Sequence, residues 1–599
     1  MVLPIADYAV IGDRHTVALV GLDGSIDWLC LPRFDSPSCF TALLGDPDGS
    51  RWLLGPAPGT ATTTRRYRTD TAVLETTHTT ATGSVRVIDL MPQGDRRADI
   101  LRRVEGLDGE VDLVHEFAVR FDYGRIKPWV HREPAGDGEA IVAVAGPDKV
   151  ALTGPTLPRA VDGRHRETLT VRAGDRLDFG LTWVPSHRDV PDPPDVDARI
   201  RATVEEQRAW VEEYHDDGPY AEAVRRSLLV LHLLTHEDTG GIVAAPTTSL
   251  PEDFGGERNW DYRYSWLRDA ALTVAAMTGD DRPDRAAPWR AWLLRAVAGD
   301  PEDLQIMYTV DGGRHLPEST LDHLAGYGGA RPVRIGNGAV EQRQNDVVGE
   351  VLDALAHARD AGLRETPDSW SLQRALINGL VDTWDEPDHG IWEIRGPRRR
   401  FTHSRIMLWV AFDRGVRAIE EHGLDGPLSV WREQRDRVRT AILRDGVSPR
   451  TGALRQHDAT DEVDAALLLA GEVGFLAPDD PVVLATIAAV ERDLLRDGLV
   501  LRYRTETGVD GVPGGEHPFL ACSFWLVSAY AGAGRQADAE ALMDRLLALR
   551  NDVGLLSEEY DVTGRRMAGN HPQAFSHLAL VRAARSLHRF GTSTGLVRS

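Results

Sequence analysis

The spacing of helices in the C-terminal two thirds of the chain constrains its fold most strongly. From about residue 218 onward, apolar residues recur at helical spacing and predict twelve helices. After each even-numbered helix the chain turns within a few residues. After each odd-numbered helix it runs for roughly 17–40 residues, well beyond ordinary loop length. The expected helices span 218–236, 265–278, 285–299, 340–361, 367–384, 402–422, 428–444, 463–475, 481–496, 517–532, 535–549 and 570–590.

This alternation predicts the architecture of the helical part. Antiparallel helices connected in this way place every long connection at the same end. Six helical hairpins that close into a ring form an (α/α)6 barrel, with one end walled by long loops. Because binding and catalytic residues concentrate in such loops, we expect the functional site at that end.

The first part of the chain carries a different pattern. Short β-branched runs separated by Gly, Asp and Pro turns, such as "VDLVHEFAVRFDYG", predict an antiparallel β-sandwich. A Pro/Asp-rich break, "PSHRDVPDPPDVD", follows it. We therefore expect a multidomain β + α chain: an N-terminal antiparallel β-sandwich over 1–193, a linker helix over 194–217 and the (α/α)6 barrel over 218–599.

Composition excludes several classes of protein. A chain of 599 residues is too long for one ordinary core. Its net charge of −24 argues against nucleic acid or an anionic membrane as a partner. No apolar run reaches the roughly 18 residues that span a bilayer. The three cysteines fit a reducing compartment, and the first residues lack the pattern of a signal peptide, so we expect a cytoplasmic protein.

Two carboxylates in the long loops attract attention. The stretch "HGIWEIRG" places Glu393 between Trp392 and Ile394, where a charge is expensive to bury unless it is used. Glu558 lies with Glu559 in a polar loop, where a solvated acidic pair is the plain interpretation. Two carboxylates over one mouth suit glycoside hydrolysis, which needs a protonated acid and an ionised base. The apolar neighbours favour Glu393 as the acid, and the polar neighbours favour Glu558 as the base.

A third stretch, "NWDYRYSWLRDAALT", enters the second expected helix. It combines Tyr262 and Trp266 with Arg268 and Asp269. The Arg–Asp pair could be a helix cap with a salt bridge, or it could hold sugar hydroxyls between aromatic walls. Position alone does not decide between the two. No P-loop, zinc-protease helix or Cys-x-x-Cys pair is present, so no metal ligands are expected.

The sequence resembles the glucoamylase/trehalase-like family, glycoside hydrolase family 15, and most closely its bacterial branch with a trehalase-like N-terminal domain. The matching stretches run from end to end of the chain and are together highly specific. They are "DGSIDWLCLPRFDSPS", "SLPEDFGGERNWDYRYSWLRDA", "LPESTLDHLAGYGGARPVRIGN", "GIWEIRG" and "LLSEEYDVTGRRMAGNHPQAFSHLAL".

The resemblance implies a β-sandwich, an (α/α)6 barrel and inverting release of β-glucose from a nonreducing α-glucosyl end. It implies Glu393 as general acid, Glu558 as general base and Tyr262 as a holder of the attacking water. Arg268 and Asp269 would bind the glucosyl ring. The remaining expected substrate-binding residues are aromatic: Trp266, Trp392 and Phe575.

Two positions depart from the fungal pattern. Ile394 replaces a second acidic residue after the acid, and Phe575 replaces a Trp near the start of the last helix. The first departure weakens a starch-type acceptor site. Within the family, trehalase is preferred, and glucoamylase-like or isomalto-oligosaccharide hydrolysis is the alternative. This preference rests on the resemblance.

Two alternatives to a glycoside hydrolase stay open. An inverting sugar phosphorylase needs only one acid, and Glu558 argues against it. A noncatalytic glycan sensor should have lost one of the two carboxylates. Trehalases of this kind are linked to phosphate and magnesium dependence, although the sequence shows no motif for either. The expected partner is an α-glucoside disaccharide or oligosaccharide, and a homo-oligomer is left open.

The N-terminal motif "DWLCLPRFDSP" carries one further expectation. Its alternating Trp28, Cys30 and Phe34 are typical of sandwich core. Arg33 and Asp35 flank Phe34 in a Pro-bounded loop, which could lean over the barrel mouth and close the pocket around a disaccharide.

Overall fold

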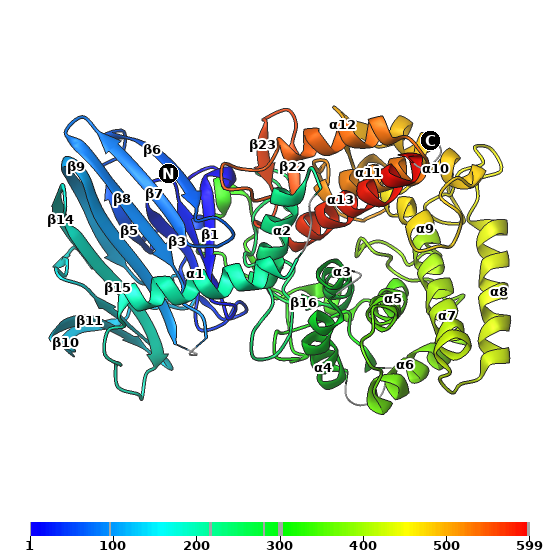
Figure 1. Ribbon diagram of the computed structural model, residues 1–599, viewed down its shortest axis with the longest axis horizontal. Coiled ribbons are helices and arrows are strands. Elements are labelled where there is room, and N and C mark those ends of the chain that lie inside the picture. Colours follow the sequence, from blue (N-terminus) through cyan, green and yellow to red (C-terminus); the bar gives the residue numbers. More distant parts are fainter. Residues whose placement is uncertain (1, 95–96, 215–217, 280–281, 298–302, 596–599) are drawn as a thin grey trace.

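The computed structural model describes residues 2–94, 97–214, 218–279, 282–297 and 303–595. Figure 1 shows layered strands on one side and a group of helices on the other, with helix α1 (Val196–Glu212) running between them. The end of the expected linker (215–217), the end of the third expected helix (298–299), residue 1 and residues 596–599 lie outside the described residues.

The β part is an antiparallel sandwich held together by one long strand. Strand β9 (Ala98–Ala118) pairs with β5 (Arg51–Pro56) and β14 (Arg164–Arg172) through its second half, within one sheet layer. Through its first half it pairs with β8 (Gly83–Leu90) and β15 (Arg176–Pro185) of the other layer. One strand therefore belongs to both layers, and the apolar side chains between them form a common core.

The remaining strands of this part extend the two layers. They are β1 (Tyr8–Gly12), β2 (Val17–Gly21), β3 (Ser25–Cys30), β4 (Ser38–Phe40), β6 (Ala61–Tyr67), β7 (Leu74–Thr80), β10 (Trp129–Ala135), β11 (Gly138–Ala145), β12 (Asp148–Thr153) and β13 (Arg159–Val161). The pairs between neighbours are antiparallel, as the sequence predicted.

The helices after α1 correspond one by one to the twelve expected ones. They are α2 (Ala221–Leu233), α3 (Leu267–Thr278), α4 (Ala286–Ala296), α5 (Asp346–Asp360), α6 (Pro367–Leu380), α7 (Thr402–His422), α8 (Leu428–Asp445), a 3-10 turn η7 (Ala465–Leu468) continued by α9 (Leu469–Glu472), α10 (Pro481–Asp493), α11 (Leu520–Gly532), α12 (Gln536–Leu547) and α13 (Ala574–Gly595). Short two-stranded ribbons decorate the long connections: β16 (Ser265–Trp266) with β17 (Met307–Tyr308), β18 (Ser319–Thr320) with β19 (Arg334–Ile335), β20 (Leu495–Arg496) with β21 (Leu499–Val500), and β22 (Glu559–Asp561) with β23 (Arg566–Ala568).

The second helix of each hairpin belongs to a closed inner ring. Contacts run from α3 to α5, α7, η7 with α9, α11 and α13, and α13 returns to α3. The inner helices are buried on nearly every face, as in α11, whereas outer helices such as α8 bury one stripe. The expected (α/α)6 barrel is confirmed, and the long connections all open at one end of it.

The fourth and the last expected helices depart most from their expected bounds, the last running over Ala574–Gly595 instead of 570–590, and the eighth is only partly α-helical. The fourth expected helix begins at Asp346 rather than 340, because the amide of Asn345 bonds instead to the Asp388 carboxylate at 3.0 Å. The eighth is reduced to η7 and α9. Its start is capped by the Asp464 side chain on the Ala466 amide, and the chain turns away at Gly474, which has φ +77°.

Arg263 fixes the barrel to the sandwich. Its side chain is fully buried and pairs with Asp261 at 2.6 Å. It also donates to the Ser36 carbonyl and the Tyr123 hydroxyl of the sandwich, each at 2.9 Å. The Trp28 indole of β3 donates to the barrel-side carbonyl of Pro246 at 2.8 Å. Hydrogen bonds from the β-sandwich therefore hold Arg263, the residue next to Tyr262, in position.

The N-terminal loop takes part in this interface. Phe34 is buried, and Arg33 pairs with Asp35 and with Asp311 of the barrel part. None of these residues lines the pocket described below. The expectation that this loop closes the pocket is therefore wrong, because its side chains pair across the interface instead.

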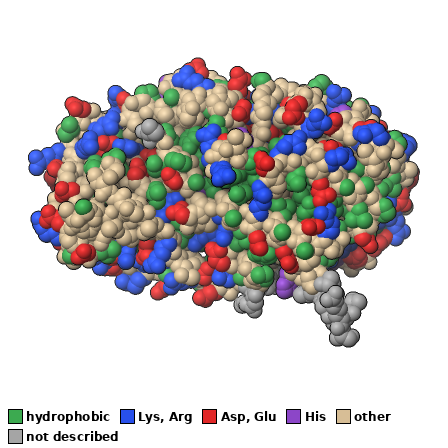
Figure 2. All heavy atoms as spheres, turned by 90° about the horizontal axis from the view of Figure 1, so that it is seen from above, with side chains coloured by type: hydrophobic (Ala, Val, Ile, Leu, Met, Phe, Trp, Pro, Cys, Tyr) green, Lys and Arg blue, Asp and Glu red, His purple; other side chains and the backbone are tan. Residues whose placement is uncertain are grey.

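The surface carries charges of both signs. Figure 2 shows Lys and Arg interspersed with Asp and Glu over the face seen from above. None of the helices in the described ranges combines the length and apolar character needed to cross a bilayer. The three cysteines, Cys30, Cys39 and Cys522, are buried and unpaired.

Candidate active site

A pocket opens at the long-loop end of the barrel, with an empty volume of about 810 Å³ that includes open solvent above it. Five of the six long connections supply its lining. The structure brings all the expected site residues to this one pocket: Tyr262, Trp266, Arg268, Asp269, Trp392, Glu393, Glu558 and Phe575.

Glu393 lies in a tight turn between α6 and α7. Its backbone has φ +56°, a left-handed conformation that is uncommon for a residue other than glycine. Gly390 begins the turn with φ +69°, where an added Cβ would lie 2.9 Å from the Phe401 ring. The turn therefore depends on glycine, and it directs the Glu393 side chain, which is 20% exposed, toward the pocket.

The Glu393 carboxyl is partly desolvated and held from two sides. Trp266 Nε1 donates to Glu393 Oε1 at 2.6 Å, and Arg268 Nη2 lies 3.6 Å from the same oxygen. Burial raises the pKa of Glu393, while Arg268 and the Trp266 hydrogen bond oppose the rise. The expected elevated pKa of Glu393 agrees with this direction.

Arg268 and Asp269 begin helix α3 and form a buried pair. Arg268 Nη2 lies 3.1 Å from Asp269 Oδ2, and Arg268 Nη1 donates to the Ile391 carbonyl at 2.8 Å. Arg268 Nε has no hydrogen-bond partner in the described part of the chain. Burial raises the pKa of Asp269, and Arg268 opposes the rise. The pair is a salt bridge at a helix start that also lines the pocket, so the two sequence interpretations are compatible.

Glu558 lies in the last long connection and is fully buried. Its Oε2 accepts from the Asn570 amide at 3.2 Å, and its Oε1 has no partner among the described residues. Burial raises the pKa of Glu558 to about 8, and the Glu252 carboxylate adds to the rise, while Arg502 and Tyr262 oppose it. The expectation of a solvated, polar setting for Glu558 is wrong, because its neighbours in space differ from its neighbours in sequence.

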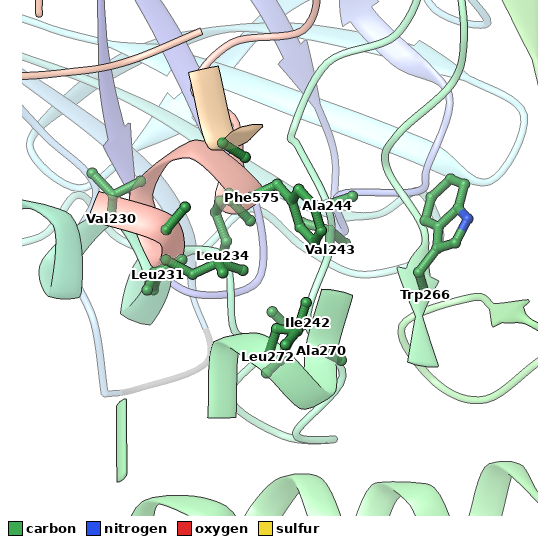
Figure 3. Packing of buried hydrophobic residues seen from close by; sticks show 14 of the residues in the cluster. Val230, Leu231, Leu234, Ile242, Val243, Ala244, Trp266, Ala270, Leu272 and Phe575 are labelled. Carbon is green, nitrogen blue, oxygen red and sulfur yellow. The ribbon is translucent and has the colours of Figure 1, made fainter. Parts of the chain in front are cut away.

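The aromatic residues wall the pocket. The rings of Trp266 and Tyr262 meet edge to face, with centroids 5.6 Å apart. Phe575 lies at the start of α13 beside Ala244, whose carbonyl accepts from the Ala574 amide, and Figure 3 shows this packing. The Phe575 ring faces the Arg268 guanidinium at 6.0 Å. These rings offer apolar faces on which a pyranose can stack.

Trp392 is held in position by contacts with Asp464, Phe519 and Trp525. Its Nε1 donates to both carboxylate oxygens of Asp464, at 2.9 and 3.0 Å. Its ring packs against Phe519 and Trp525 at 5.7 and 5.9 Å. The residue that precedes Glu393 is thus fixed by the barrel core, which restrains the turn carrying the acid candidate.

The sequence interpretation missed several polar residues of the lining: Glu252, Arg258, Asn337, Arg395, Arg502, Tyr503, Asp510 and Gln573. Two signals were available. Arg502 interrupts the apolar run "LVLRY", just as Glu393 interrupts its own apolar surroundings. The stretches that carry the family resemblance also contain five of the missed residues: Glu252, Arg258, Asn337, Arg395 and Gln573. For Tyr503 and Asp510 the sequence offered no signal.

Trp260 also lines the pocket. The guanidinium groups of Arg334 and Arg395 lie over its ring, at 4.5 and 4.4 Å from the ring centroid. Arg395 also pairs with Glu318 at 2.6 Å. These contacts restrain the turn that contains Glu393, because Arg395 belongs to the same segment.

A magnesium ion does not fit the buried carboxylates of the pocket. The oxygens of Glu252, Glu516 and Glu559 approach one another closely. Arg502 Nη2 already lies among them, at 2.9, 2.7 and 3.3 Å. A hard cation would have to displace a guanidinium group that already contacts all three carboxyl groups.

A second group of candidate ligands is exposed on the surface. Asp360, Glu421 and His422 approach one another there, and Arg417 pairs with both Asp360 and Glu421. An imidazole and a competing guanidinium suit magnesium poorly. The pocket arginines Arg268, Arg395 and Arg502 are likewise paired with carboxylates, which a phosphate would have to displace.

The geometry combines two carboxyl groups from separate loops, a guanidinium–carboxylate pair and stacking surfaces. Such a site can protonate a leaving oxygen, activate a water and hold a sugar ring. Residues 218–585 match the family described as Glycosyl hydrolases family 15, and residues 2–172 match the family described as Trehalase-like, N-terminal. The first match covers more than half of the chain. The chain therefore belongs to glycosyl hydrolase family 15 and is an enzyme that hydrolyses O-glycosidic bonds.

The chain is also similar to individual proteins within and around this family. The chain is 40% identical to a trehalase of Mycolicibacterium smegmatis over 613 residues, covering 97% of this chain and 90% of the relative. It is 29% identical to an isomaltose glucohydrolase of Kribbella flavida over 317 residues, covering 50% and 73%. A bacterial glucoamylase complexed with acarbose shares the fold, with a TM-score of 0.71, 12% identity and coverage of 98% and 94%.

Proposed function

We propose that this enzyme is a trehalase, which cleaves the α-glucosidic bond of a nonreducing glucose disaccharide with inversion and releases β-glucose first. The observation that carries the proposal is the similarity to a trehalase along nearly the whole of both chains. The pocket supports it, because two carboxyl groups, Glu393 and Glu558, line one cavity together with aromatic rings and a guanidinium–carboxylate pair.

In this proposal Glu393 is the general acid. Its partly buried carboxyl has a raised pKa, which favours the protonated form needed to protonate the leaving oxygen. Trp266 holds one carboxyl oxygen at 2.6 Å, which fixes the orientation of the carboxyl group. Trp392 and the contacts around Trp260 keep the turn in position.

Glu558 is proposed as the general base and Tyr262 as a holder of the attacking water. Glu558 Oε1 has no hydrogen-bond partner among the described residues, so a water molecule can use it. Tyr262 lines the same pocket, and its hydroxyl contributes to stabilising the ionised carboxylate. Arg268 and Asp269 would bind hydroxyl groups of the glucosyl ring, because one donates and the other accepts.

A side-by-side assay tests the proposal. Trehalose, maltose, isomaltose and soluble starch are supplied to the purified enzyme, and glucose release is measured with and without phosphate and magnesium. We expect trehalose to give the highest kcat/KM and only glucose as product. Appearance of glucose 1-phosphate would identify a phosphorylase, and no turnover of any substrate would leave a glycan sensor.

Proton NMR of fresh product tests the stereochemistry. The β anomer should appear first, followed by mutarotation. Initial α-glucose would rule out inversion.

The second candidate is an isomaltose or isomalto-oligosaccharide hydrolase. It is favoured by the similarity to an isomaltose glucohydrolase over half of this chain. A kcat/KM for isomaltose above that for trehalose would select it. The proposed roles of Glu393 and Glu558 are the same in both cases.

A further inference from the structure

Arg502 gathers three buried carboxyl groups behind the pocket. It lies after β21 and binds Glu516 with two nitrogens, Nε to Oε1 at 3.2 Å and Nη2 to Oε2 at 2.7 Å. Nη2 also donates to Glu252 Oε2 at 2.9 Å and lies 3.3 Å from Glu559 Oε1. The side chains of the three glutamates are at most 1% exposed. We call these four residues the Arg502 cluster.

Several oxygens of this region have no hydrogen-bond partner among the described residues. They include Glu252 Oε1, Glu559 Oε1 and Glu558 Oε1. The other oxygen of Glu559 accepts from the His517 amide at 3.0 Å. Buried carboxylate oxygens without a donor are costly, unless one of the carboxyl groups is protonated and donates.

The charges of the region do not balance. Arg258 adds a second guanidinium, 3.5 Å from Glu516 and 2.5 Å from Asp510. Together with Glu558, five buried carboxyl groups face two guanidinium groups. Full ionisation would leave three negative charges in excess in a desolvated space, and proteins relieve such an excess by retaining protons.

We propose that the Arg502 cluster retains a proton on Glu559 and thereby sets the pH at which Glu558 becomes ionised. Glu252 is the positioning residue, because its negative charge moves the ionisation of Glu558 to higher pH. The inference rests on the proposed role of Glu558 as general base. The charge of an ionised Glu558 raises the pKa of Glu559, so Glu559 stays neutral when Glu558 gives up its proton.

The surroundings agree with this assignment. Burial, Glu252, Glu516 and Glu558 raise the pKa of Glu559, and Arg502 opposes the rise. The groups that face Glu558 are Glu252 from the α2–α3 connection, Tyr262 before β16, Arg502 after β21 and Glu559 in β22. When Glu558 ionises, a neutral Glu559 leaves the Arg502 charge available to it and to Glu252 and Glu516.

Two isosteric variants test the proposal through the pH dependence of kcat/KM. The acidic limb of this profile reports the ionisation of the general base in the free enzyme. Glu252→Gln removes a like charge, so we expect the acidic midpoint to fall by about one pH unit. Glu559→Gln replaces a neutral carboxyl by a neutral amide, so we expect the midpoint to stay within about 0.3 unit of the wild type.

Each result has a defined meaning. An unmoved midpoint in Glu252→Gln overturns the assigned role of Glu252. A downward shift in Glu559→Gln as large as that in Glu252→Gln means that Glu559 is charged, and it overturns the location of the proton. A merely structural role of either residue would lower kcat or stability without moving the midpoint, and thermal melts check the fold.

An infrared measurement tests the proton without relying on activity. At neutral pH, the difference spectrum between the wild type and Glu559→Gln should contain the C=O stretch of one protonated carboxyl group. A carboxylate band in its place overturns the proposal. If Glu558→Gln is fully active, the proposed function of Glu558 fails instead, and the infrared result still reports on Glu559.

Discussion

Trp266 Nε1 donates a hydrogen bond of 2.6 Å to Glu393 Oε1. Trp266 is the last residue of β16, and Glu393 lies in a turn more than a hundred residues later in the chain. The bond fixes the carboxyl in orientation and stabilises its ionised form, because an indole can only donate. One contact therefore influences both the geometry and the protonation of the acid candidate.

Trp266→Phe removes this hydrogen bond and keeps an aromatic ring. The pKa of Glu393 should rise, because a donor that favours the carboxylate is lost. Since the acid must be protonated, the alkaline limb of the kcat/KM profile should move to higher pH. We also expect kcat to fall by roughly tenfold through lost orientation. A shift of the alkaline limb to lower pH would contradict the role of this contact.

Glu393→Gln and Glu558→Gln should each lose on the order of 10²–10⁴ in kcat, the usual contribution of a positioned acid or base. Glu559→Gln should lose much less. Glu386 lies in the same connection as Glu393 and is 53% exposed, so Glu386→Gln is a matched control that should leave kcat unchanged. Steady-state kinetics with the preferred disaccharide measure all four. An inactive Glu559→Gln beside an active Glu558→Gln would reverse the assignment of the base.

Asp269→Asn should lower kcat/KM by roughly tenfold to a hundredfold, because hydrogen bonds to a charged group contribute about 1.5–3 kcal/mol. The neutral amide accepts more weakly from a sugar hydroxyl and no longer balances Arg268. Asp284→Asn is a suitable control, since Asp284 is 61% exposed before α4, in a short connection away from the pocket. Equal kcat/KM for the Asp269 variant and the wild type would remove Asp269 from the substrate site.

Asp261→Asn should destabilise the fold by about 3–5 kcal/mol, because it leaves the buried guanidinium of Arg263 without its charge partner. Asp311→Asn breaks a pair with Arg33 whose partners are 47% and 36% exposed, and should change stability by less than about 1 kcal/mol. Chemical denaturation compares the two. Similar losses in both variants would show that burial at the interface does not matter.

Glu558 should make stability depend on pH in an unusual direction. Its pKa is about 8 in the folded chain, against an ordinary value of 4.5 that applies when the chain is unfolded. Between these values the folded state binds the extra proton, so the free energy of unfolding falls as pH rises from about 4.5 to 8. Glu558→Gln should therefore melt higher than the wild type at pH 8. The difference should vanish near pH 4.5, and a difference that grew toward acid pH would contradict the assignment.

Helix periodicity and connection lengths sufficed to predict the barrel, because the pattern of buried residues in helices such as α5 and α7 follows directly from packing. The two candidate carboxylates were predicted for different reasons. Glu393 stands out as a charge in an apolar segment. Glu558 was recognised through its motif, whereas its environment was misjudged, since its contacts with Glu252 and Arg502 join segments roughly 50–300 residues apart in the sequence.

The interface residues were beyond sequence reasoning for the same cause. Arg263 is an ordinary arginine in its segment, and its importance arises only when distant loops converge. The interpretation of the Phe34 loop failed because a charged pair flanking an aromatic ring fits a pocket rim and a domain interface equally well. Only the positions of Asp311 and Tyr123 in space separate the two.

The contacts of Arg263 and Trp28 bear on how the chain can be divided. A barrel produced without the sandwich would turn Arg263 toward water or leave it without the Ser36 and Tyr123 acceptors, directly beside Tyr262. The sandwich alone would leave the Trp28 indole without its Pro246 acceptor. The two parts are therefore expected to melt in a single calorimetric transition, and truncation at the linker to yield a barrel that is inactive even where it remains folded. The β-sandwich supports the barrel residues next to Tyr262 through these hydrogen bonds, so the two parts form one structural unit.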